Sequence, residues 1–176
     1  MIAATLVPVE EYIASSYTPD VDYEEGRLVE KNAGKWKHAR LQILIGSHIV
    51  AHESGWRITG LTDQRIRVAP NRFFIPDVCA VMDTQPYQDL LEYPPLFTIE
   101  VLSEGDSFSD SEKKAHQYLE LGVPCVWTVD PETGGCYRHT SGAILTVSDG
   151  VVCVEGSPIA IPIPELLSQL RPAPRP

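Results

Sequence analysis

The sequence has few basic residues, few cysteines and no long apolar run. Its 176 residues include 14 Lys and Arg against 24 Asp and Glu, a net charge of −10. This balance argues against a protein that coats nucleic acid non-specifically, because that affinity comes from neutralising phosphates. No apolar run approaches the roughly 20 residues that a membrane-spanning helix needs. We therefore expect no membrane span.

The four cysteines form no Cys-x-x-Cys pair, and Glu10 and Glu11 stand where an export signal would be apolar. These features predict a cytoplasmic protein with reduced, mostly buried cysteines. The 43% hydrophobic and 22% charged residues are typical of a globular chain. We expect one domain over residues 1–170 and a frayed tail over residues 171–176, RPAPRP.

Apolar residues recur with helical periodicity in some segments and with extended periodicity in others. Helices are predicted at residues 7–13, 36–53 (ended by Gly55), 108–121 and 163–170. Strands are predicted at residues 22–31, 56–60, 64–68, 73–82, 97–103 and 125–130, with further short strands between 134 and 155. The pattern predicts an α/β (α+β) fold in which helices flank a central mixed β-sheet.

The basic residues are concentrated in one segment. Residues 26–75 hold nine of the 14 Lys and Arg and only three acids, a local net charge of +6. This asymmetry fits either a face for an anionic partner or an ordinary solvated face. Arg65 and Arg67 point to the same side of a strand, since side chains alternate, and we expect them to contact phosphates if the partner is nucleic acid.

Two predicted strands carry an acid inside an apolar run, Asp77 in FIPDVCAVM and Glu100 in FTIEVLS. Burying a carboxylate is costly unless it is paired. A hard divalent cation such as Mg²⁺ is the simplest partner. The alternative is that each acid pairs with an arginine or caps a loop, and the residues alone leave both interpretations open.

The helix predicted after the Glu100 strand has Asp110, Lys114 and Tyr118 at intervals of four, and therefore on one face. Lys114 lies in the first turns of this helix, near the strand end that carries Glu100. A lysine there can orient a nucleophile and offset charge on a phosphate. The alternative is a surface ion pair between Asp110 and Lys114.

Three motifs, in their order along the chain, resemble those of the Uma-two family of endonuclease-like proteins. They are Pro76-Asp77, Glu100-Val101-Leu102-Ser103 and Asp110-x-x-x-Lys114-x-x-x-Tyr118. The segments at 122–131, GVPCVWTVDP, and at 23–30, YEEGRLVE, followed by His38, extend the resemblance to roughly residues 7–170. The resemblance implies the restriction-endonuclease-like, PD-(D/E)XK superfold.

The resemblance also implies a metal-dependent endonuclease that hydrolyses nucleic acid, with DNA as the expected substrate. Asp77 and Glu100 would bind Mg²⁺ (or Mn²⁺), with the Val101 carbonyl as a third ligand, and Lys114 would be the catalytic lysine. In the simplest superfold pattern this lysine stands two residues after the acid, where this chain has Leu102. The residues placed around the same cleft are Glu24, Glu30, His38, Asp110 and Tyr118.

Two other functions fit parts of the sequence. The acidic segment Glu104-Gly105-Asp106 and the net charge favour a catalytically inactive binding or regulatory module with the same fold. A set of exposed apolar residues would instead favour a dimer interface. The candidates are Trp36, Tyr87 and Tyr93. A homodimer is compatible with every one of these interpretations.

Overall fold

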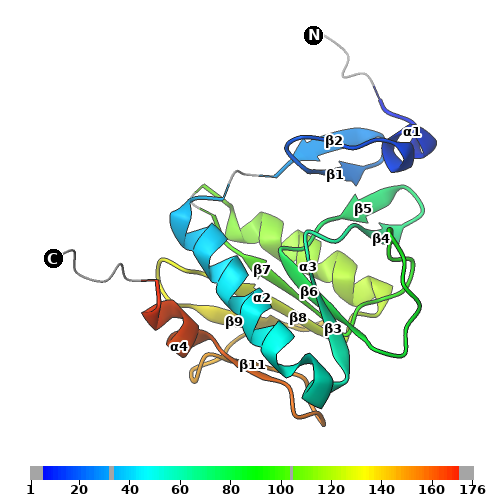
Figure 1. Ribbon diagram of the computed structural model, residues 1–176. Coiled ribbons are helices and arrows are strands. Elements are labelled where there is room, and N and C mark those ends of the chain that lie inside the picture. The colour runs from blue at the N-terminus through cyan, green and yellow to red at the C-terminus, as the bar shows by residue number, and fades with distance from the viewer. Residues whose placement is uncertain (1–5, 32–33, 104, 171–176) are drawn as a thin grey trace, which may run out of the picture.

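The computed structural model describes residues 6–31, 34–103 and 105–170. Its helices are α1 (Val9–Ala14), α2 (Trp36–Trp56), α3 (Phe108–Leu121) and α4 (Ile163–Ser168) (Figure 1). Its strands are β1 (Val21–Glu24), β2 (Arg27–Glu30), β3 (Ile58–Thr62), β4 (Ile66–Ala69), β5 (Arg72–Phe74), β6 (Val78–Met82), β7 (Phe97–Val101), β8 (Cys125–Val129), β9 (Cys136–His139), β10 (Ile144–Thr146), β11 (Val151–Cys153) and β12 (Ala160–Pro162). The predicted tail, residues 171–176, lies outside the described residues.

The centre of the fold is a six-stranded sheet with the strand order β10-β9-β8-β7-β6-β3. β7 and β8 are parallel, whereas the other neighbours are antiparallel. Parallel neighbours need a long crossover, and α3 provides it between β7 and β8. The predicted α+β fold with a mixed sheet flanked by helices is confirmed.

Both faces of this sheet are covered, because successive side chains of a strand point to opposite faces. In β6, Val78 and Ala80 belong to the apolar cluster that includes α2 and α4, whereas Cys79 and Val81 belong to the cluster that includes α3. α2 and α3 accordingly lie on opposite sides of the sheet (Figure 1). The same alternation in β7 directs Glu100 towards α3.

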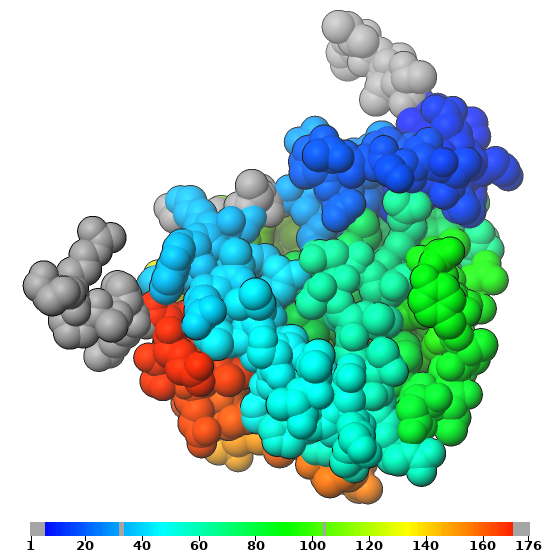
Figure 2. All heavy atoms as spheres, viewed as in Figure 1, coloured from blue at the N-terminus to red at the C-terminus, as the bar shows by residue number. Residues whose placement is uncertain are grey.

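Residues 22–31 form a hairpin and not the single strand that was predicted. The turn residues Glu25 and Gly26 both have positive φ values, of 49° and 89°. Gly26 adopts its value without strain because glycine lacks a Cβ. β1 also pairs with β5, which gives a second sheet with the order β2-β1-β5-β4. The β1–β2 hairpin and α1 form a ridge on the molecule, and the surface is hollowed beneath the hairpin, beside α2 (Figure 2).

The second helix is longer than predicted. α2 continues past Gly55 to Trp56, because the Trp56 side chain packs against the main apolar cluster. Arg57 ends the helix in the left-handed conformation, with φ of 59°, and its N–H donates to the carbonyl of Glu53.

The burial of the cysteines agrees with the prediction from the sequence, whereas the three candidate dimer residues do not form one patch. Cys79, Cys125 and Cys136 are buried, Cys153 is half-buried, and all four are free thiols. Trp36 and Tyr87 are exposed, but Tyr93 is half-buried and its hydroxyl donates to the Pro86 carbonyl. The beginning of α2 and the loop between β6 and β7 lie on opposite sides of the view in Figure 1.

In the part of the chain that the structure describes, no helix combines the length and the apolar character needed to cross a bilayer.

Candidate active site

A cavity of about 690 Å³ lies between the β1–β2 hairpin, the ends of the central strands and the beginning of α3. Its lining includes seven carboxylates and four Lys or Arg side chains. Most residues that the sequence singled out line it, namely Glu24, Glu30, His38, Asp77, Glu100, Val101, Asp110 and Lys114. Tyr118 is fully buried and reaches Glu100 from α3.

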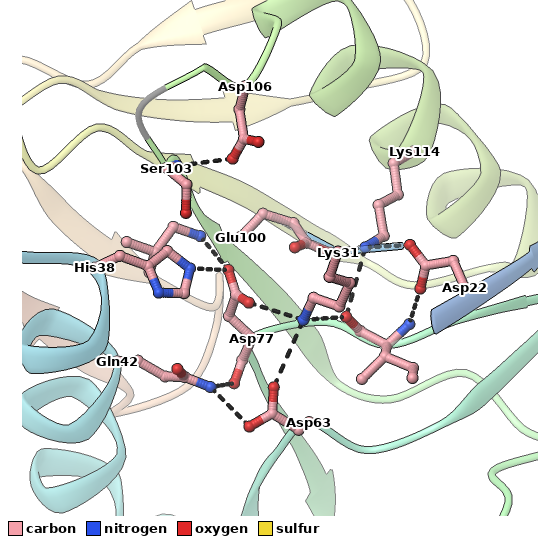
Figure 3. A network of polar contacts seen from close by, with 12 residues as sticks. Asp22, Lys31, His38, Gln42, Asp63, Asp77, Glu100, Ser103, Asp106 and Lys114 are labelled. Carbon is pink, nitrogen blue, oxygen red and sulfur yellow. Dashed lines mark hydrogen bonds and ion pairs between the residues drawn. The ribbon is translucent and has the colours of Figure 1, made fainter. Parts of the chain in front are cut away.

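Asp77 is anchored through both of its carboxylate oxygens. Oδ1 accepts a hydrogen bond from Lys31 Nζ at 2.9 Å, and Oδ2 accepts the Val101 N–H at 2.8 Å and lies 3.1 Å from His38 Nε2 (Figure 3). Burial by itself raises the pKa of Asp77, but the His38 hydrogen bond and the Lys31 charge outweigh it and lower the pKa. Asp77 is therefore ionised at neutral pH.

Glu100 stands on β7 next to Asp77, because β6 and β7 are paired neighbours. Its Oε1 accepts the Tyr118 hydroxyl at 3.0 Å and lies 3.2 Å from Lys114 Nζ. Burial raises the pKa of Glu100 to about 7, although the Lys114 charge opposes the shift. The pKa values of the two carboxylates are therefore shifted in opposite directions, and Glu100 is close to its titration point at neutral pH.

Lys114 extends from α3 towards the sheet and forms a buried ion pair with two acids. Its Nζ lies 3.0 Å from Asp22 Oδ2 and 3.2 Å from Glu100 Oε1. Burial lowers the pKa of Lys114, but the charges of Glu100 and Asp22 outweigh it and raise the pKa. Lys113 instead pairs with Asp110 at 2.7 Å, and both are largely exposed, so Asp110 does not form the ion pair with Lys114 that the spacing allowed.

Four residues of this network were not among the site candidates predicted from the sequence, namely Asp22, Lys31, Asp63 and Gln42. Asp22 Oδ1 accepts the Ile75 N–H at 2.7 Å, and the Ile75 carbonyl accepts a hydrogen bond from Lys31 Nζ at 2.9 Å. Asp22 carried a signal, because it stands between the buried Val21 and Tyr23 just as Asp77 stands in an apolar run. Lys31 carried none, since it is a lone lysine after an exposed strand.

Two acids that the resemblance placed around the cleft lie at its wall. Glu24 and Glu30 line the cavity, but within the described ranges neither forms a hydrogen bond or an ion pair with Asp77 or Glu100. In the acidic segment of the sequence, Asp106 accepts the Ser103 N–H at 2.7 Å. Glu104 lies outside the described residues.

The two arginines that were expected to contact phosphates support the fold instead. Arg65 lies over the Tyr12 ring at 4.5 Å, and Arg67 lies over the Phe73 ring at 5.1 Å. Arg67 also pairs with Glu92 at 2.9 Å. Their alternation put both on one side, as predicted, but that side packs against the aromatic cluster beneath the hairpin and does not line the cavity.

The oxygen donors of the site fit a hard divalent cation. Mg²⁺ is commonly held by one or two carboxylates, with water and substrate oxygens completing its shell. Asp77 and Glu100 offer two carboxylates at neighbouring strands, and ammonium groups already lie among oxygens there. Among the described residues no group of three or more His, Cys, Asp and Glu is placed to hold a metal ion.

The raised pKa of Glu100 predicts a pH-dependent effect of Glu100→Gln on stability. Because the folded pKa of about 7 exceeds the ordinary value of 4.5, the contribution of Glu100 to stability is lost as the pH rises through this window. Relative to the wild type, the free energy of unfolding of Glu100→Gln should rise by on the order of 2 kcal/mol between about pH 5 and about pH 8. Urea unfolding in EDTA measures it. Glu112→Gln, at an exposed position of α3, is the control and should not reproduce the trend.

Comparison with known proteins agrees with this architecture. The structure resembles a crystal structure from Anabaena variabilis described as "a putative nuclease belonging to DUF820", with a TM-score of 0.78 and 20% sequence identity over 92% of this chain and 98% of that chain. The fold is therefore restriction-endonuclease-like. Residues 9–157 match the model of the Uma2 family, described as "Putative restriction endonuclease". The chain belongs to this family, as its motifs predicted. No curated protein matches the chain.

Proposed function

We propose that this protein is a divalent-metal-dependent endonuclease that hydrolyses phosphodiester bonds, with DNA as the expected substrate. The observation that carries the proposal is the meeting of Asp77, Glu100 and Lys114 in one cavity, although they come from the residue before β6, from β7 and from α3. Two carboxylates and one ammonium group at a cavity wall form a set that can hold a metal ion and stabilise a charged phosphate. The family and the fold support the same class of protein.

Asp77 and Glu100 would hold Mg²⁺ or Mn²⁺, with the Val101 carbonyl as a further oxygen donor. When bound, the ion supplies Lewis acidity towards the phosphoryl oxygen and the attacking water. The protein orients both acids, because the Val101 N–H and His38 hold Asp77 and the Tyr118 hydroxyl holds Glu100. Fixed ligands need no reorganisation as the charge develops.

Lys114 would stabilise the negative charge that builds up on the phosphate during attack. It is held by Asp22 as well as by Glu100, so its position does not depend on Glu100 alone. An ammonium group in a partly water-excluded cavity acts more strongly on such charge than one in bulk water.

The proposal predicts cleavage that requires the metal and Glu100. Supercoiled plasmid, single-stranded DNA and RNA are incubated with wild type in Mg²⁺, in Mn²⁺ and in EDTA. We expect cleavage only with a metal, and about a hundredfold or greater loss in Glu100→Gln, because its neutral amide binds a divalent ion much more weakly. Initial rates measured by gel electrophoresis give the ratio.

Asp110→Asn is the matched control, since it removes an acid from the same cavity without touching Asp77 or Glu100. Its rate should remain within about threefold of wild type, the range of a screened surface charge. Cleavage that persists in EDTA, or equal losses in the two variants, would contradict the assigned site.

One observation favours a second function, a nucleic-acid-binding or regulatory module without turnover. The cavity carries seven carboxylates against four Lys or Arg side chains, which disfavours a phosphate backbone unless cations offset the acids. The two functions differ in one measurement. Asp77-dependent Mn²⁺ binding with cleavage supports the enzyme, whereas nucleic-acid binding that neither needs nor responds to a metal supports the module.

A further inference from the structure

The Lys31 ammonium group lies among oxygen atoms at the centre of the polar network. Lys31 directly follows β2, and its Nζ is 2.9 Å from Asp77 Oδ1, 2.9 Å from the Ile75 carbonyl and 3.5 Å from Asp63 Oδ1 (Figure 3). Two carboxylates and a carbonyl are the donors that a hard divalent cation prefers. The ammonium group thus fills a position suited to such an ion.

Lys31 also binds Asp77 Oδ1, the carboxylate oxygen whose contact could be exchanged for a metal ion. The other oxygen, Oδ2, is held by the Val101 N–H of the central sheet and by His38 of the 21-residue helix α2. Neither of these elements can shift without disturbing the main core. An ion that binds Asp77 in a fixed orientation would therefore have to use Oδ1.

Electrostatics prevents both cations from using that oxygen at once. A lysine is charged at neutral pH, and two positive groups within a few ångströms in a partly buried site repel each other strongly. Binding of a divalent ion at Asp77 and retention of the Lys31 contact are therefore alternatives.

The end of β2, which Lys31 follows, is loosely packed and could move away from Asp77. All four residues of β2 are exposed, and β2 is the edge strand of its sheet. β1 stays attached to the fold, because it pairs with β5 and Asp22 accepts the Ile75 N–H and contacts Lys114, so the opening is confined to β2 and Lys31. The strand end could open without breaking the central sheet, since weakly packed edges open most easily.

We propose that Lys31 is the resident cation of the Asp77 site, and that a divalent ion binds there only after Lys31 and the adjoining end of β2 are displaced. Lys31 is then a positioning residue that sets the metal affinity of the site. This inference rests on the metal site of the proposed function.

Titration with Mn²⁺, followed by the electron paramagnetic resonance signal of the free ion, tests the competition without an activity assay. Lys31→Met should lower the dissociation constant for Mn²⁺ by about tenfold or more, the scale of one lost charge-assisted hydrogen bond. Lys113→Met removes the same charge from the same cavity, but Lys113 contacts Asp110 and not Asp77. It should change the constant by no more than about twofold to threefold, because exposed charges are screened.

A second measurement uses the wild-type chain and does not depend on any variant folding. Amine acetylation followed by mass spectrometry reports how accessible Lys31 is, with the exposed Lys113 as the internal reference. Saturating Mn²⁺ should raise the labelling rate of Lys31 relative to Lys113 about threefold or more, since an ion-paired amine is protected and a displaced one is not.

The outcomes separate this inference from the metal site on which it rests. Mn²⁺ binding that is lost in Asp77→Asn but unchanged or weaker in Lys31→Met overturns the role of Lys31 alone, as does unchanged Lys31 labelling. No Mn²⁺ binding by wild type, or binding that survives in Asp77→Asn, overturns the metal site and this inference with it.

Discussion

Replacing Asp77 with Asn is expected to abolish metal-dependent cleavage, lowering the initial rate by about a thousandfold or more. The variant removes the charge that would hold the metal but retains an oxygen that can accept the Val101 N–H. Cleavage assays and Mn²⁺ titration on the same preparation measure the two losses together. Retained cleavage in a clean Asp77→Asn preparation would contradict the assigned site.

The choice of Asn matters, because the structure shows what Ala would leave behind. Asp77→Ala would leave Lys31, His38 and the Val101 N–H without their acceptor, and breaking one side of a buried ion pair typically costs about 3–5 kcal/mol. Loss of activity would then be mixed with loss of folded protein. Asp83→Asn, just beyond the other end of β6, is a control that should retain activity, since the Asp83 carboxylate pairs with the exposed Arg57 and lies outside the lining of the cavity.

Replacing Lys114 with Met is expected to lower the free energy of unfolding by about 3 kcal/mol or more. The substitution leaves the Asp22 and Glu100 carboxylates buried together without the ammonium group that now lies between them. Because Glu100 then resists ionisation more strongly, the loss should grow as the pH rises through neutrality. Urea unfolding at several pH values measures both effects.

Lys113→Met is the matched control, because Lys113 is the next residue on α3 and pairs with the exposed Asp110. It should change the free energy of unfolding by no more than about 0.5 kcal/mol. In the Lys114→Met background, adding Glu100→Gln should recover part of the loss, since it removes one of the two unpaired charges. Equal effects of the two single lysine variants would contradict the buried network.

These expectations share one physical origin, a compact set of charges that serves both folding and the proposed chemistry. Lys114 and Lys31 neutralise acids that would otherwise be too costly to bury. The Lys31 charge helps to keep Asp77 ionised. Burial raises the pKa of Glu100 to about 7 against the opposing Lys114 charge, so Glu100 can bind or release a proton at little cost near neutral pH. A substitution in this network is therefore expected to alter stability and activity together.

The order of the main helices and strands, the family, and two of the acids that line the cavity could be predicted from the amino-acid sequence alone. Asp77 and Glu100 could be selected because each interrupts an apolar run, and Lys114 because helical spacing put it on the same face as Tyr118, whereas Lys113 points about 100° away. These features depend on the local periods of helix and strand, which a single chain segment displays.

The contacts that each predicted face makes depend on the packing of distant segments, which no local pattern displays. Lys31 reaches Asp77 across 46 residues, and Asp22 reaches Ile75 across 53. Arg65 and Arg67 face one side as their alternation required, but the rings against which they pack come from α1 (Tyr12) and β5 (Phe73). Periodicity specifies the side on which a residue lies, whereas its partner depends on how distant segments pack.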